Sequence, residues 1–101
     1  MSPTARSIGL LEAEGYAVDI VERWIVGANI KRDLFGIFDL LALRDTITLA
    51  VQVTDSSHVA AHRTKINSSP LLPRIQAAGW LIELHGWRKT DNRWQCRREV
   101  L

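Results

Sequence analysis

The stretch that decides the fold is RDLFGIFDLLALRDTITLAVQVT, residues 32–54. Its last third alternates apolar with smaller or polar side chains, the period-two pattern of a β-strand, and a second apolar run precedes it. The stretch therefore predicts a β-hairpin of Leu40–Arg44 and Thr46–Thr54. Asp39 opens the first strand, and Gln52 and Thr54 lie two residues apart on the second. A carboxylate in such an apolar sheet requires a partner, a metal ion or a solvent cleft.

The segments before this hairpin predict one helix and one strand. Ser2 offers a hydroxyl cap and Pro3 a favourable first-turn residue, so a helix is expected from there to Gly15. Tyr16–Ile25 is predicted to be a strand and Val26–Arg32 a loop.

The segments after the hairpin predict two helices and two strands. The helices are expected over His58–Ile66, behind a cap at Asp55, and over Leu71–Ala78. The strands are expected over Trp80–Trp87 and Arg93–Val100. Because the hairpin strands carry apolar residues on both faces, helices should cover both sides of the sheet. The expectation is a single α/β domain over residues 1–101, with a mixed sheet flanked by helices.

Composition restricts the class of protein. No apolar run approaches the roughly 20 residues that a membrane span needs, so no membrane partner is expected. A single cysteine, Cys96, allows no internal disulfide, which fits a cytoplasmic protein. Residues 1–57 carry five Lys or Arg against eight Asp or Glu, whereas residues 58–101 carry eight against three. The basic second half could bind phosphates or could be an ordinary solvated face.

The order of these elements and three short motifs resemble the PD-(D/E)XK nuclease superfamily. The residues that carry the similarity are Gly15-Tyr16-Ala17-Val18, then Asp39, then Val51-Gln52-Val53-Thr54. They are similar to the Gly-aromatic-x-Val, Asp and Glu-x-Lys motifs of small Holliday-junction-resolvase-like and VRR-NUC-like nucleases, many of them encoded by phages. The similarity extends over about Thr4 to Trp87. It implies a restriction-endonuclease-like αβββα(α)ββ core.

The resemblance also implies a chemistry, namely metal-dependent endonuclease cleavage of DNA, including branched or junction DNA, with Mg²⁺ or Mn²⁺. Asp39 matches the metal-binding Asp of the family, Gln52 stands in the Glu position and Thr54 in the Lys position, and Val53 would offer its backbone carbonyl to the metal. Gln52 supplies no charge and Thr54 no cation, so the site departs from the family pattern. Lys65, from the following helix, is the candidate to replace the missing lysine.

The residues expected to contact DNA are basic or imidazole side chains on both sides of this site: Lys31, Arg32, His58, His62, Arg63, Arg88 and Lys89. Resolvase-like proteins act as homodimers, and the Arg93–Val100 strand with the exposed tryptophans is the expected contact. The resemblance places the protein in the cytoplasm of a bacterium or of a phage-infected host cell.

Simpler interpretations remain for several of these residues. Asp39 could pair with Arg32 or be capped by backbone N–H groups, and Asp33 could pair with Arg32 or Arg63 or be a second metal carboxylate. Gln52 and Thr54 could be hydrogen-bonded within the sheet, as in a nuclease fold that has lost its chemistry.

Other functions also remain open. The main alternative is a catalytically silent DNA-binding or dimerising module, and a third is a phage protein that targets a host factor. His58 and His62 have the i, i+4 spacing of half a zinc site, but no further Cys or His completes it. Trp24, Trp87 and Trp94 could belong to the core or face a partner.

Overall fold

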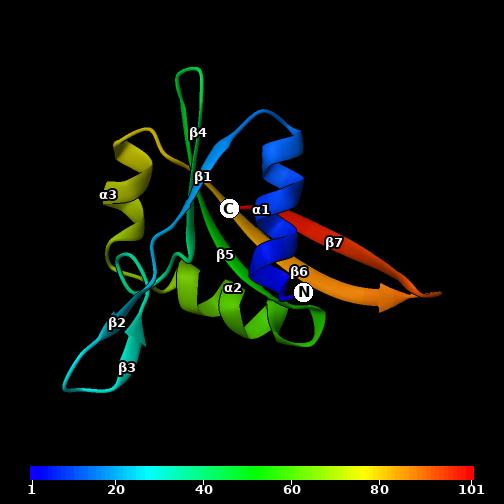
Figure 1. Cartoon of the computed structure of the whole chain (residues 1–101). Coiled ribbons are helices and arrows are strands. Elements are labelled where there is room, and N and C mark those ends of the chain that lie inside the picture. The colour runs from blue at the N-terminus through cyan, green and yellow to red at the C-terminus, as the bar shows by residue number, and fades with distance from the viewer.

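The computed structural model describes residues 1–101 and contains one mixed sheet covered by helices on both faces. The elements are α1 (Pro3–Ala13), β1 (Ala17–Ile20), β2 (Arg23–Ile25), β3 (Ile30–Arg32), β4 (Leu40–Arg44), β5 (Ile47–Asp55), a 3₁₀ turn (Ser56–His58), α2 (Val59–Asn67), α3 (Leu72–Ala77), β6 (Leu81–Thr90) and β7 (Arg93–Val100). Figure 1 shows their arrangement.

The five-stranded sheet has the order β1-β4-β5-β6-β7. All neighbours are antiparallel except β5 and β6, which run parallel and are joined through α2 and α3. The central β4–β5 hairpin closes with a two-residue turn at Asp45-Thr46, where Asp45 has a φ of 52°. The predicted hairpin and the α/β class are therefore confirmed.

Alternation along β5 divides the core into two layers. Leu49, Val51 and Val53 pack with Leu11 of α1 on one face of the sheet. Ala50 lies on the other face, in a cluster that contains residues from α2, α3 and β6: Val59, Ile66, Ile75, Ile82 and Leu84. Gln52 lies two residues after Ala50 on β5, and Asp39 lies two residues before Leu41, which pairs with Ala50, so both side chains belong to the α2 face.

Local signals explain the helix ends. The Ser2 side chain accepts a hydrogen bond from the Ala5 N–H at 3.1 Å, and Gly15 follows α1 with a φ of +92°. The Asp55 side chain accepts from the Ser57 N–H at 2.9 Å, as expected for a cap before α2. No helix is both long and apolar enough to cross a membrane.

The prediction was wrong over residues 16–32. The expected strand Tyr16–Ile25 breaks after Ile20, and Arg23–Ile25 turns away to pair with Ile30–Arg32 in a separate two-stranded sheet. We call residues 23–32 the arm; Figure 1 shows it projecting from the body below α3. The arm was missed because its strands are almost wholly exposed, and without a buried face a strand shows no apolar alternation.

Candidate metal centre

Asp39 lies directly before β4 and is fixed by its backbone. Its N–H donates to the Val51 carbonyl at 2.9 Å, and its carbonyl accepts from the Val21 N–H at 2.9 Å, so the residue is tied to β5 and to the end of β1. The side chain is only 6% exposed. Its Oδ2 accepts a hydrogen bond from the Val53 N–H at 2.8 Å and another from Gln52 Nε2 at 3.1 Å.

No arginine pairs with Asp39, so the interpretation as a partner of Arg32 is wrong, whereas capping by a backbone N–H is present. Val53 contacts the carboxylate through its N–H. Its carbonyl, which sequence reasoning had assigned to the metal, accepts from Gln52 Nε2 at 3.3 Å.

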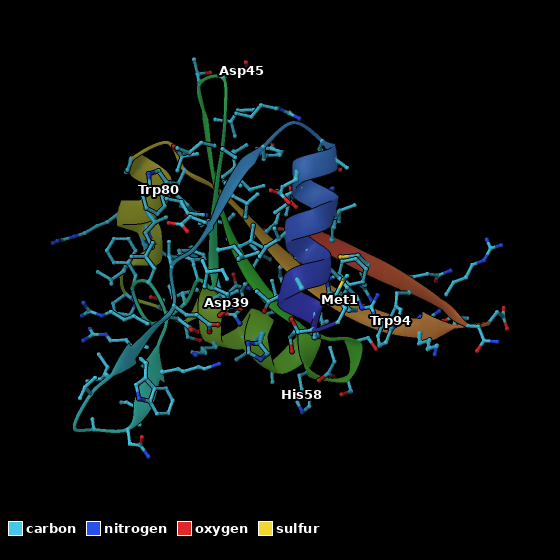
Figure 2. The ribbon with its side chains drawn as sticks, viewed as in Figure 1. Met1, Asp39, Asp45, His58, Trp80 and Trp94 are labelled. Carbon is cyan, nitrogen blue, oxygen red and sulfur yellow. The ribbon has the colours of Figure 1, made fainter.

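Two further carboxylates lie beside Asp39. One ligand oxygen each from Glu22, Asp33 and Asp39 lies within 4.8 Å of the others. Glu22 is the residue before β2 and Asp33 the residue after β3, so the two ends of the arm deliver these side chains. Both are half-buried. Figure 2 shows Asp39 at the point where the arm leaves the body. We call the three residues the acidic cluster.

The surroundings hold Asp39 in its protonated form until neutral pH. Burial is the largest cause and raises the pKa of Asp39 from 3.8 to about 7, against the Val53 N–H, which lowers it. The charge of Asp33, a hydrogen bond between the Asp33 and Asp39 carboxyls, and the charge of Glu22 raise the pKa further. Asp39 therefore keeps a proton that reduces the repulsion among the three carboxylates, and a bound cation would reduce the same repulsion.

Binding of a divalent cation at the acidic cluster is expected to release a proton from Asp39. Mg²⁺ or Mn²⁺ binds the carboxylate form, so close to one proton should leave at pH 6, when Asp39 with a pKa of about 7 is mostly protonated. At pH 8.5 the release should approach zero. Calorimetry at each pH in two buffers of different ionisation enthalpy measures the proton count. A pH-independent count would contradict a site that contains Asp39.

Gln52 adds an unused acceptor to the same place. Its amide nitrogen donates to Asp39 and to the Val53 carbonyl, but its Oε1 is buried and has no hydrogen-bond partner. The residue is only 4% exposed. A buried unpaired acceptor costs about 1–3 kcal/mol, and an amide oxygen is a ligand that Mg²⁺ and Ca²⁺ accept. The residues present therefore fit a hard divalent cation with oxygen ligands.

Two of the predicted catalytic residues do not join the cluster. Thr54 is half-buried at the end of β5, opposite Gly86 on β6, and its side chain makes no hydrogen bond. Lys65 is exposed on α2 and forms no ion pair. Neither Thr54 on β5 nor Lys65 on α2 therefore brings a fixed positive charge to the acidic cluster.

His62 lies on α2, and its imidazole is influenced by the charge of Asp33 in the acidic cluster. Its pKa is lowered, first by burial and then by the charges of Lys65 and His58, while Asp33 acts to raise it. The Nδ1 atom is buried and has no partner. His58, in contrast, is exposed and bonds to Asp55 at 2.9 Å, so the two histidines form no joint site.

The predicted DNA contacts fall into separate groups. Lys31 and Arg32 lie on the arm, and Arg88 and Lys89 lie near the far end of β6, on the opposite side of the molecule in Figure 1. Arg63 forms an ion pair with Glu99 of β7 at 2.5 Å, which excludes the predicted pair with Asp33. Among the tryptophans, Trp87 is buried, and Trp24 and Trp94 are 54% and 42% exposed.

Glu22 is the functional candidate that sequence reasoning missed. The signal was present: Glu22 and Asp33 flank the turn 26–29 at equal distances, and two residues of that turn, Gly27 and Asn29, have positive φ. A hairpin around that turn would have placed them opposite each other. Comparisons with family models, with curated proteins and with solved structures found no match, so the site is argued from its geometry.

Proposed function

We propose that the protein is a divalent-metal-dependent DNA endonuclease built on a nuclease-like fold. The observation that carries this proposal is the acidic cluster beside a buried, unpartnered Gln52 Oε1. A centre with three carboxylates has no evident structural task, because mutual repulsion disfavours it without a cation. Mg²⁺ or Mn²⁺ would be held by Glu22, Asp33 and Asp39, with the Gln52 amide as an additional oxygen ligand.

The topology supports the same proposal. When the arm is set aside, the elements follow the order αβββααββ, which is the order that the resemblance to PD-(D/E)XK nucleases implies. Asp39 stands before the second strand of the main sheet and Gln52 on the third, which are the family positions of the metal-binding residues. Glu22 and Asp33 compensate for the charge that Gln52 lacks.

The chemistry assigns a role to each group. A divalent cation held there supplies a Lewis acid for a phosphate oxygen and lowers the pKa of a water molecule. Asp39 loses its proton when the cation binds, and its hydrogen bonds from Val53 and Gln52 fix its orientation. His62, whose lowered pKa keeps it neutral at pH 7, is the group available to receive a proton from the attacking water. It takes the role that the sequence had suggested for Lys65.

The proposed enzyme acts as a homodimer. β7 is an edge strand of the main sheet, and it exposes Trp94 and Val100, which are 42% and 76% exposed. Exposed apolar side chains on an edge strand form a surface that a second copy can cover.

The deciding experiment tests cleavage and binding together. Purified protein is incubated with linear, nicked, flapped and four-way-junction DNA in Mg²⁺, Mn²⁺ or EDTA, and the Glu22→Gln/Asp33→Asn variant serves as the control for contaminating nucleases. Metal-dependent cleavage that the variant lacks would support the enzyme. Salt-sensitive binding without cleavage would identify a silent DNA-binding module instead. Absence of both binding and cleavage would leave only an interaction protein.

A further inference from the structure

A hollow of about 460 Å³ opens at the base of the arm, next to the acidic cluster. Asp33 lines the hollow and is also a member of the acidic cluster, so a ligand in the hollow would lie beside the candidate metal centre. Arg23 and Arg32 line it on the arm side, and Phe35 and Leu71 line it on the body side. Its volume lies within the range of roughly 300–1,000 Å³ that small-ligand sites occupy.

The two arginines of this hollow are cross-strand neighbours. Arg23 and Arg32 are paired residues in the β2–β3 register, which sets their Cβ atoms about 5 Å apart. Arg23 and Arg32 are both exposed, and neither guanidinium group forms an ion pair or a side-chain hydrogen bond. Like charges directly opposite each other destabilise a strand pair. A phosphate between them would remove the repulsion and accept hydrogen bonds from both guanidinium groups.

Phe35 occupies a backbone position that suits another residue type. It has a φ of +57° and Gly36 a φ of +72°, and the Ile37 N–H donates to the Leu34 carbonyl at 3.0 Å. Two left-handed residues at the centre of a turn favour Asn-Gly, and a bulky aromatic residue is an outlier there. The ring is 47% exposed and contacts Trp80, with 5.9 Å between ring centroids. Phe35 therefore combines a contact with Trp80 with a position in the lining of the hollow, where it is about half exposed.

We propose that this hollow binds one unpaired nucleotide of a DNA strand. Arg23 and Arg32 hold its phosphate, and its base stacks on Phe35, while Asp33 connects this subsite to the metal centre. Stacking on an aromatic ring requires a base that has left the duplex, and it tolerates any of the four bases. The inference rests on the proposed nuclease function and refines it: the substrate carries an unpaired nucleotide beside the cleaved phosphate, as flaps and single strands do.

Binding of fluorescently labelled oligonucleotides, measured by anisotropy in EDTA and again in Ca²⁺, tests the subsite separately from cleavage. Phe35→Asn is expected to weaken single-strand binding about tenfold and to leave blunt-duplex binding unchanged. Because asparagine suits the left-handed position, the thermal midpoint of this variant should not fall. Phe35→Leu retains an apolar contact with Trp80 and should weaken binding similarly.

A charge-matched pair of variants tests the arginines. Arg23→Gln/Arg32→Gln should lower the slope of log affinity against log salt by about 1.4 for a single strand. The comparison variant Arg88→Gln/Lys89→Gln removes the same charge from two predicted DNA contacts far from the hollow. It should lower the affinities for single strand and duplex by the same factor, and so preserve the preference for single strands.

Unchanged single-strand affinity in both Phe35 variants would overturn the subsite, as would an unchanged preference for single strands over duplex in Arg23→Gln/Arg32→Gln. Loss of binding in the hollow variants, in a protein that never cleaves, would retain the subsite and refute only the nuclease.

Discussion

Asp39→Asn is expected to lose metal-dependent cleavage about 1,000-fold, and to be more stable than the wild type above pH 7 in the absence of metal. The first effect follows from the loss of a negatively charged ligand at a centre that provides several kcal/mol of transition-state stabilisation, since each 1.36 kcal/mol corresponds to a factor of ten in rate. The greater stability follows from the loss of the buried Asp39 carboxylate charge, which no cation balances when metal is absent.

The sign of the stability effect follows from the raised pKa. Asp39 has a pKa of about 7 in the folded protein and 3.8 as a free side chain, so the folded state binds its proton more tightly. Its stabilising contribution is complete below pH 3.8 and is lost as the pH rises to 7, where the buried carboxylate is ionised among Asp33 and Glu22. The Asn variant avoids this loss, which is on the order of 2–4 kcal/mol at pH 8.

The geometry allows the exchange without repacking. An amide oxygen in place of Oδ2 can accept the same bonds from the Val53 N–H and from Gln52 Nε2. The new NH₂ group can then donate toward Asp33 in place of the shared proton.

Urea unfolding in EDTA at pH 5 and pH 8 measures the stability, and calorimetric titration with Mn²⁺ measures the affinity. Asp45→Asn is the matched control, because Asp45 lies in the turn at the opposite end of β4 (Figure 2), where asparagine tolerates its φ of 52°. It should change neither cleavage nor metal affinity. Equal stability of Asp39→Asn and wild type at pH 8 would mean that Asp39 carries no charge penalty, and the metal argument would then lose its basis.

The sheet and the helices were predictable because burial leaves a period in the sequence. β5 alternates between two apolar layers, as its sequence predicts, and the register of the predicted hairpin places Gln52 Nε2 3.1 Å from Asp39 Oδ2. Caps at Ser2 and Asp55 and the glycine after α1 gave the helix boundaries. These signals are local, or they depend on one buried face.

The rest of the site was not predictable in the same way. The arm has no buried face, so its strands show no apolar alternation in the sequence. Because the arm was not predicted, the proximity of Glu22 and Asp33 was not predicted either. Which acid an arginine meets is also a tertiary question: Arg63 pairs with Glu99, on a strand 36 residues later. The need for glycine at position 86 is also a tertiary effect. A Cβ there would lie 2.4 Å from Val59 Cγ2, and no sequence pattern predicts that contact.

A buried polar network between α1 and the sheet was likewise invisible in the sequence. Ser7 and His85 are both 0% exposed, and Ser7 Oγ lies 2.9 Å from His85 Nδ1 and 2.8 Å from Trp87 Nε1. Because the indole N–H can only donate, Ser7 Oγ accepts from Trp87. The other ring nitrogen of His85, Nε2, lies 2.8 Å from the Glu83 carboxylate, so the network runs from Trp87 through Ser7 and His85 to Glu83.

Ser7→Ala is expected to lower the free energy of unfolding by about 2–5 kcal/mol, more than a typical single substitution. The change leaves two buried groups without partners, the Trp87 N–H and the His85 Nδ1. Ser68→Ala is the control, since Ser68 is exposed and its side chain makes no hydrogen bond. Urea unfolding at pH 7 compares the three proteins. A loss below 1 kcal/mol would show that the hydroxyl is replaceable by solvent and that α1 is held to the sheet by its apolar contacts alone.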